Sequence, residues 1–296
     1  MERPPRPAAG PSRPHTVRQR VRHDPDTARG NPMTTAGTSR MEIPGNALTG
    51  APCWATLLTH DIAAARDFYG QVLGWEFAPS PMGEEWSTAT ADGIPVASLG
   101  AVAPALPVAV DWLAYFAVAD SNEAAGRVRE RGGTVAIGPV DTPSGRATLA
   151  ADPTGPTFGL WEGRMVDDWQ HWRLHRPWWL VLESADPFAA ALFYGAVLDW
   201  EYREGEDAVG YEDDEIVLRD HGHVAARLRP RDPRNPALHP RWNLIFPVPD
   251  VAEAARRAVE LGAVRLAETT SVADEGAVLR DPDGAVFSLA PASAGH

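Results

Sequence analysis

The chain has 296 residues, of which 44% are apolar and 23% are charged, a composition typical of a soluble globular protein with room for two domains. Its formal net charge is −13, although residues 1–48 carry eight arginines against four acids, so the remainder is strongly acidic. An acidic surface repels phosphate backbones, which argues against a nucleic-acid partner. The complete lack of lysine excludes a Schiff-base lysine and the phosphate-binding lysine of a P-loop.

Residues 1–49 are predicted to form a disordered tail, because proline, arginine and glycine dominate the segment and large apolar side chains are nearly absent. The tail has no apolar core of a signal peptide, and the single cysteine, Cys53, has no partner for an internal disulfide. The most apolar stretch, residues 100–120, is interrupted by prolines and an aspartate, so no membrane span is expected. We therefore expect a cytoplasmic protein with no membrane partner, present as a monomer or a homodimer.

One pattern recurs four times after residue 50: an apolar strand ends in an aspartate, and an amphipathic helix follows. The four strands read "CWATLLTHD" (53–61), "WLAYFAVAD" (112–120), "WWLVLESAD" (178–186) and "WNLIFPVPD" (242–250). Each aspartate is placed to cap its helix by accepting a hydrogen bond from a backbone N–H group. Apolar residues follow at helical spacing, and glycines stand where a left-handed cap would end three of the helices: Gly74, Gly132 and Gly262.

Short β-prone runs and turns follow each helix. The second and fourth copies close with "ADPTGPTFGLWE" (151–162) and "RDPDGAVFSLAP" (280–291), in which an Asp-Pro-x-Gly turn leads into the last strand. The repeating unit is therefore βαβββ, present four times as two pairs. This arrangement predicts one domain over residues 50–164, a linker over 165–176 and a second domain over 177–292.

The two halves also share a phrase, "RDFYGQVLGWEF" (66–77) and "ALFYGAVLDWEY" (191–202), which indicates an internal duplication. Its aromatic residues are predicted to belong to the framework, as part of a helix that braces a curved sheet. The two copies differ at Gly74 and Asp199, and the preceding strands differ at Leu58 and Glu183, so we expect the two halves to have diverged.

The chain resembles the vicinal oxygen chelate (VOC) superfamily, which includes glyoxalase I, the bleomycin-resistance proteins and the extradiol dioxygenases. The residues that carry the resemblance are Asp61 with Phe68-Tyr69 and Leu73-Gly74-Trp75, Asp186 with Phe193-Tyr194 and Leu198, and the Asp-Pro-x-Gly turns at 152–155 and 281–284. The resemblance implies an α+β fold, in which four βαβββ modules form two tandem half-barrels of the glyoxalase/bleomycin-resistance/dioxygenase type, each curved into a cup.

The resemblance also implies where metal ligands would stand. In metal-dependent members they lie on first strands, seven residues before the capping aspartate, and on closing strands, seven residues after the aspartate of the Asp-Pro turn. Those positions hold, in this chain, Trp54, Leu113, Trp179 and Asn243, then Gly159 and Ser288. A divalent cation needs several convergent nitrogen, carboxylate or thiolate donors. We therefore expect no metal site and no cofactor.

Strand alternation, counted from those positions, predicts which side chains face each cup. The residues expected to bind a ligand are Trp54, Thr56, Tyr115 and Trp161 in the first cup, and Trp179, Glu183, Asn243 and Ser288 in the second. Aromatic walls suit a flat conjugated ligand, because rings stack favourably beyond their simple burial. The alternative is that the tryptophans fill a collapsed cup.

Glu183 is the one acid expected on a cup-facing strand, and it is the single catalytic candidate. It could hydrogen-bond a ligand or act as a general base in apolar surroundings. The alternative is a structural ion pair with an arginine, for which Arg227 is the candidate partner.

Three functions are compatible with these features. The first is a metal-independent binding protein that sequesters or presents a mainly aromatic metabolite or antibiotic, for resistance or as an accessory to secondary-metabolite biosynthesis; the acidic body would attract a cationic ligand. The second is a cofactor-free lyase, isomerase or hydroxylase-like enzyme that uses Glu183, Asn243 and an arginine for proton transfer. The third is a non-catalytic scaffold with filled cups.

Overall fold

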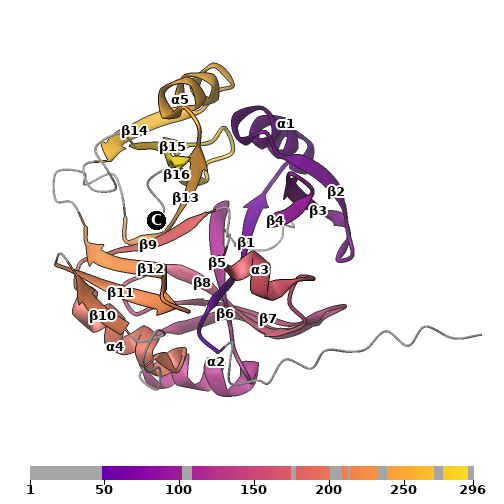
Figure 1. Ribbon diagram of the computed structural model, residues 1–296. Helices are drawn as coiled ribbons and strands as arrows, with labels where there is room; N and C mark the ends of the chain where they lie inside the picture. Colours follow the sequence, from indigo (N-terminus) through magenta and orange to yellow (C-terminus); the bar gives the residue numbers. More distant parts are fainter. Residues whose placement is uncertain are drawn as a thin grey trace, which may run out of the picture. The chain divides into compact units, whose positions relative to one another are not determined.

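The computed structural model describes residues 49–101, 109–174, 178–200, 209–212, 214–231, 239–269 and 276–292 (Figure 1). The predicted disordered tail lies outside these ranges except for its last residue, Thr49. Within them, no helix is long and apolar enough to cross a membrane.

The first half of the chain forms one eight-stranded sheet with the strand order β2-β3-β4-β1-β5-β8-β7-β6. Its elements are β1 (Pro52–Thr59), α1 (Ile62–Leu73), β2 (Glu76–Ser80), β3 (Gly83–Ala91), β4 (Ile94–Ala101), β5 (Asp111–Ala117), α2 (Ser121–Glu130), β6 (Thr134–Thr142), β7 (Gly145–Ala151) and β8 (Thr157–Gly163). The central strands β1 and β5 pair antiparallel, whereas β4 joins β1 and β8 joins β5 in parallel.

The second half repeats this arrangement in the order β10-β11-β12-β9-β13-β16-β15-β14. A short helix, α3 (Trp169–Leu174), precedes it, and its elements are β9 (Trp179–Ser184), α4 (Pro187–Val197), β10 (Val209–Glu212), β11 (Glu215–Asp220), β12 (His223–Pro230), β13 (Arg241–Val248), α5 (Val251–Glu260), β14 (Val264–Thr269), β15 (Gly276–Arg280) and β16 (Val286–Pro291). The predicted α+β fold of four βαβββ modules is confirmed.

The helix caps follow from the four aspartates. The Asp61 carboxylate accepts a hydrogen bond from the Ala64 amide at 3.0 Å, and the other three aspartates cap α2, α4 and α5 in the same way. Gly74 ends α1 in the left-handed conformation, with φ 71°. Asp199 stands in the corresponding place after α4 and adopts φ 58°, a conformation that aspartate tolerates better than most residues, while its carboxylate accepts a hydrogen bond from Arg127 at 3.1 Å.

Six aromatic residues of the repeated phrase lie in the core: Phe68, Tyr69, Trp75, Phe193, Tyr194 and Trp200. The Tyr69 hydroxyl accepts a hydrogen bond from Trp112 Nε1 at 2.9 Å and donates one to Asp281 Oδ2 at 2.8 Å. The second copy repeats this chain from Trp242 through Tyr194 to Asp152, at 2.9 and 3.1 Å. Each chain joins a helix of one half to the Asp-Pro turn of the other, so the two halves brace each other.

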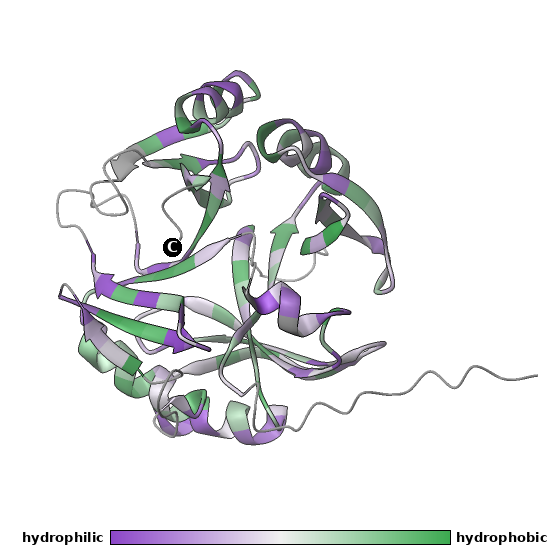
Figure 2. Ribbon diagram, in the orientation of Figure 1, coloured by the Kyte–Doolittle hydropathy of each residue, from purple (hydrophilic) through white to green (hydrophobic). Residues whose placement is uncertain are grey.

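Helix packing follows the same crossed pattern, because α1 packs against α5 and α2 packs against α4 (Figure 1). Between the halves, Phe246 of β13 contacts Trp112 of β5, and Phe116 of β5 contacts Trp242 of β13, with ring centroids 5.1 and 5.2 Å apart. Figure 2 shows apolar residues along the central strands of both sheets. The concave faces, which lie on the other side of the strands from this core, therefore remain as the place for a site.

Candidate functional site

The linker helix α3 lies against the aromatic wall of the first cup. The Trp54 ring stacks on Trp172 of α3 at 5.9 Å between centroids, and Trp172 stacks on Trp169 at 5.2 Å. The indole N–H of Trp54 donates to Ser98 Oγ at 2.9 Å, and that of Trp172 donates to the Pro95 carbonyl at 2.7 Å. Both α3 tryptophans are buried, so the ring predicted to meet a ligand is already covered by the chain itself.

The remaining residues predicted for the first cup are also engaged internally. The ring of Tyr115 lies so close to Gly159 that a Cβ there would come within 2.2 Å of a ring carbon. Burial raises the pKa of Tyr115 to about 12, so its hydroxyl stays protonated at neutral pH. Trp161 Nε1 donates to the Arg164 carbonyl at 3.2 Å, and Thr56 is buried. These residues therefore make internal contacts, although Trp54, Tyr115 and Trp161 remain partly buried.

The concave face of the second sheet is lined differently. Val181, Ile245 and Ala290 form a small buried apolar cluster separate from the main core, and the partly buried Trp179 packs against it. Beside this cluster, Asn243 Nδ2 donates to Ser288 Oγ at 2.8 Å, and the serine hydroxyl lies 3.2 Å from Asn243 Oδ1. The second cup therefore combines an aromatic ring, an apolar floor and neutral hydrogen-bonding groups.

Charged side chains complete the second cup. Glu183 Oε1 accepts a hydrogen bond from Arg229 Nη2 at 2.8 Å, and both side chains are almost fully buried. The expected ion pair of Glu183 is therefore made with Arg229. The predicted partner, Arg227, is therefore wrong, because Arg227 pairs with Glu215 at 3.2 Å. The register of β9 and β12 explains why Glu183 pairs with Arg229, because Arg229 stands directly beside Glu183, whereas Arg227 stands beside Val181.

Arg241 is a residue of the second cup that sequence reasoning missed. It stands opposite Glu183 in the β9–β13 pairing and two residues before Asn243, so its side chain leaves the sheet on the concave side. Its Nε and Nη2 atoms are buried and have no hydrogen-bond partner among the described residues. Burial lowers the pKa of Arg241, while the charges of Asp111 and Glu183 act in the opposite direction. The same strand alternation that selected Asn243 would have selected Arg241.

Comparison with known proteins agrees with this fold. A family model described as the Glyoxalase/Bleomycin resistance protein/Dioxygenase superfamily matches residues 53–160, and one described as a Glyoxalase-like domain matches residues 179–290. The Mycobacterium bovis protein named "Putative glyoxylase CFP32" is 31% identical over 249 residues, which cover 81% of this chain and 94% of that protein. The chain belongs to the VOC superfamily. The resemblance inferred from the sequence is thereby confirmed.

Other relatives of this VOC protein carry different names. The anthracycline biosynthesis protein DauV of Streptomyces sp. strain C5 is 29% identical over 81% of this chain and 92% of its own length. Among solved structures, the Mn(II)-bound glyoxalase from Novosphingobium aromaticivorans matches with a TM-score of 0.50 and 17% identity, covering 83% of each chain. An extradiol ring-cleaving dioxygenase from B. fuscum matches with a TM-score of 0.51 and 17% identity, covering 84% of this chain and 74% of that chain. Both structures share the fold.

The residues at the family's metal-ligand positions do not fit a divalent cation. In the first cup, the space beside Gly159 is taken by the Tyr115 ring. In the second cup, Asn243 and Ser288 are neutral and hydrogen-bond each other, and the nearby carboxylate of Glu183 is held by Arg229. Within the described ranges, no group of three or more histidine, cysteine, aspartate or glutamate side chains is arranged to hold a metal. We derive no metal-dependent step for this chain.

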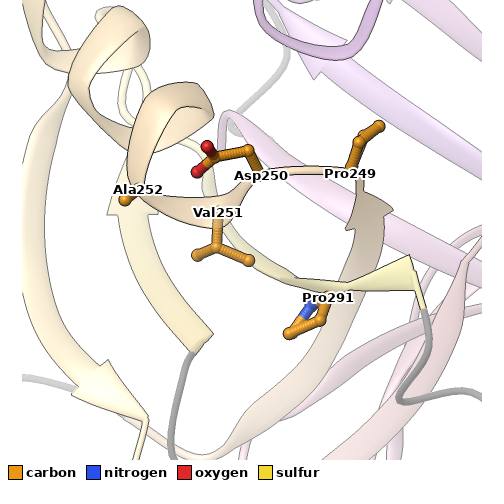
Figure 3. Close-up of a pocket in the computed structure, with 5 residues that line it drawn as sticks. All are labelled: Pro249, Asp250, Val251, Ala252 and Pro291. Atoms are coloured by element: carbon orange, nitrogen blue, oxygen red, sulfur yellow. The ribbon is translucent and has the colours of Figure 1, made fainter.

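A pocket of about 310 Å³ lies outside both cups, at the start of α5 (Figure 3). It is lined by Pro249, Asp250, Val251, Ala252 and Pro291. The Asp250 carboxylate caps α5 by accepting a hydrogen bond from the Glu253 amide at 2.9 Å, so the helix N-terminus there is already neutralised by the chain itself. We therefore place the candidate site in the second cup.

We expect the stability of the protein to depend on pH through Asp111, the acid at the start of β5. Burial raises the pKa of Asp111 from its ordinary value of 3.8 to about 6, although Arg241 opposes the shift. The folded state therefore binds this proton more tightly than the unfolded state, so stability falls as pH rises from about 4 to about 6. The shift corresponds to at most about 3 kcal/mol.

Asp111→Asn should remove this part of the pH dependence and be more stable than the wild type above pH 6. Urea unfolding of both proteins between pH 4 and pH 7 measures the difference, since all other carboxylates titrate in both. Parallel stability curves for the two proteins would show that Asp111 titrates normally.

Proposed function

We propose that this protein is a metal-independent, small-molecule-binding member of the VOC superfamily, which holds a mainly aromatic metabolite in its second cup. The observation that carries the proposal is the contrast between the cups. Trp54 of the first is stacked on Trp172, whereas Trp179 of the second stands beside a separate apolar cluster, with hydrogen-bonding groups nearby. An apolar site with a few fixed polar groups is the usual form of a small-molecule site.

The names of two relatives support an aromatic ligand. DauV, and DnrV of Streptomyces peucetius at 29% identity, are both called anthracycline biosynthesis proteins. An anthracycline has a flat polycyclic chromophore, which suits stacking on a tryptophan. We propose that this chain sequesters or presents such a metabolite, in resistance or as an accessory to secondary-metabolite biosynthesis, in the cytoplasm and as a monomer or homodimer.

The ion pair of Glu183 bears on the alternative function, a cofactor-free lyase, isomerase or hydroxylase-like enzyme. A general base needs a lone pair directed at the substrate, and one oxygen of Glu183 already accepts a hydrogen bond from Arg229. This contact favours a structural ion pair over a catalytic role for Glu183. If turnover of a bound metabolite is found and Glu183→Gln abolishes it while binding persists, the enzymatic function replaces the one proposed.

Titration with an anthracycline tests the binding proposal. Saturable binding, followed by the visible fluorescence of the ligand, is expected for the wild type. Trp179→Ala should weaken binding about tenfold or more, because stacking and apolar burial are both lost. Trp54→Ala is the matched control in the first cup, and its affinity for the anthracycline should stay within about threefold of the wild-type affinity.

The reversed ranking of these two variants would place the ligand in the first cup. No saturable binding of any polycyclic aromatic compound tried would refute an aromatic ligand altogether.

A further inference from the structure

We propose that Arg241 recognises an anion and that the ligand of the second cup carries a carboxylate group on its aromatic framework. The proposal rests on the proposed function and specifies its ligand class. It also runs against the charge of the whole chain, which is −13 and by itself favours a cationic ligand.

The position of Arg241 directs its side chain into the cup. In the β9–β13 pairing it stands opposite Glu183, and Asn243 stands opposite Val181 of the apolar cluster. Residues two apart on a strand share a face of the sheet, so Arg241 lies on the same face as the predicted ligand-binding residue Asn243. Trp242, between them, is buried on the opposite face and donates to Tyr194.

The atoms of Arg241 that lack a partner are the ones that a carboxylate uses. Nε and Nη2 are buried and unpaired among the described residues. These two nitrogens lie on one side of the guanidinium, where their N–H groups point in parallel and match the two oxygens of a carboxylate. Leaving buried donors unpaired is unfavourable, and a carboxylate would satisfy both at once.

The neighbouring acids do not occupy this fork. Glu183 Oε1 accepts its hydrogen bond from Arg229, and Asp111 Oδ1 accepts one from the Trp112 amide at 2.9 Å. Both acids influence Arg241 through their charge, with no hydrogen bond to its Nε or Nη2 atoms. Their partial compensation explains how a buried guanidinium is tolerated although two of its donors have no hydrogen-bond partner among the described residues.

The first cup has no counterpart of this arginine. Trp112 and Trp242 are equivalent in the two halves, so the residue before each is also equivalent, and these residues are Asp111 and Arg241. The residues paired with them on the first strands are Leu58 and Glu183. A cationic fork is therefore specific to the cup that keeps the features of a small-molecule site.

Two anthraquinone probes of nearly equal shape test this proposal. Anthraquinone-2-carboxylate offers the planar acid, and anthraquinone-2-carboxamide offers a neutral group of the same size. By calorimetry at pH 7.5, the wild type should bind the carboxylate about tenfold to a hundredfold more tightly than the amide, the usual range for a charge-assisted pair.

Arg241→Gln should abolish this preference and leave the affinity for the amide within about threefold. Arg241→Lys, which keeps the charge and loses the fork, should retain only a small part of the preference. Arg265→Gln is the control, since Arg265 is an exposed arginine of β14 in the same sheet, and it should keep the wild-type preference.

Equal binding of both probes by the wild type would overturn the carboxylate inference and leave the proposed function intact. A preference that survives in Arg241→Gln would assign it to another residue. If neither probe binds, the inference falls, and the anthracycline titration decides the proposed function separately.

A measurement without ligand covers the case in which Arg241→Gln does not fold. Arg241→Met removes a buried cation whose Nε and Nη2 donors have no hydrogen-bond partner among the described residues, so its melting temperature should equal or exceed that of the wild type. A fall of more than about 5 °C would show that Arg241 has a structural ion pair instead, and would overturn the proposal.

Discussion

Asp281→Ala is expected to lower the free energy of unfolding by about 3–5 kcal/mol, because this buried carboxylate holds the two halves together. Its Oδ2 accepts the hydrogen bond from Tyr69 at 2.8 Å, and its Oδ1 accepts three more from the backbone of the Asp-Pro turn, at 2.8 to 3.0 Å. The alanine variant loses all four bonds and leaves the Tyr69 hydroxyl without its acceptor. Urea unfolding at pH 7 measures the loss.

Asp250→Ala provides the matched control for Asp281→Ala. Asp250 is an exposed aspartate whose carboxylate caps α5, and loss of such a cap typically costs about 1 kcal/mol. Asp152→Ala, in the equivalent turn of the first half, should resemble Asp281→Ala, because Asp152 accepts the hydrogen bond from Tyr194. If Asp281→Ala lowers the free energy of unfolding no more than Asp250→Ala does, the hydrogen bonds from Trp112 through Tyr69 to Asp281 do not form in solution.

The fold was predictable because its signals are local and repeated. An apolar strand, a capping aspartate and a left-handed glycine each act within a few residues, and the structure places a helix after each of the four aspartates. The partners of the core aromatics were not predictable. Tyr69 and Asp281 are separated by 212 positions, and no local pattern says that a helix of one half meets the turn of the other.

The candidate site was predictable only in part. Strand alternation grouped Asn243 with Ser288, and the two side chains hydrogen-bond to each other across adjacent strands. It could not choose between Arg227 and Arg229 as the partner of Glu183, since both arginines lie on that same face and the register decides. It also could not show that α3 stacks on Trp54, because the linker has no periodicity that places it on a sheet.

Arg173→Met is expected to lower the free energy of unfolding by about 3–5 kcal/mol, because it removes the arginine that pairs with the buried carboxylate of Asp220. Arg173 is on α3, and its Nε donates to Asp220 Oδ2 of β11 at 3.1 Å, while its Nη2 donates to the other oxygen. Both side chains are at most 2% exposed. His221 Nε2 also lies 2.7 Å from Arg173 Nη1. Urea unfolding measures the loss.

The double variant Arg173→Met with Asp220→Asn removes the stranded charge and should recover more than about half of that loss. Arg256→Met, on the exposed face of α5, is the control for removing an arginine. Its free energy of unfolding should stay within about 0.5 kcal/mol of the wild-type value. A double variant no more stable than Arg173→Met would show that the charge of Asp220 is not the cause.

Arg173→Met also tests whether the Arg173–Asp220 ion pair holds α3 against the first cup. Arg173 ties α3 to the second half, whereas Trp172, one residue earlier, stacks on Trp54 in the first. If the ion pair holds α3 in place, Arg173→Met should expose these rings, with a red-shifted tryptophan emission and stronger acrylamide quenching under native conditions. Ligand binding should stay within about threefold of the wild type, because Arg173 is not among the residues that form the second cup. Unchanged emission would mean that aromatic stacking alone holds α3 against the first sheet.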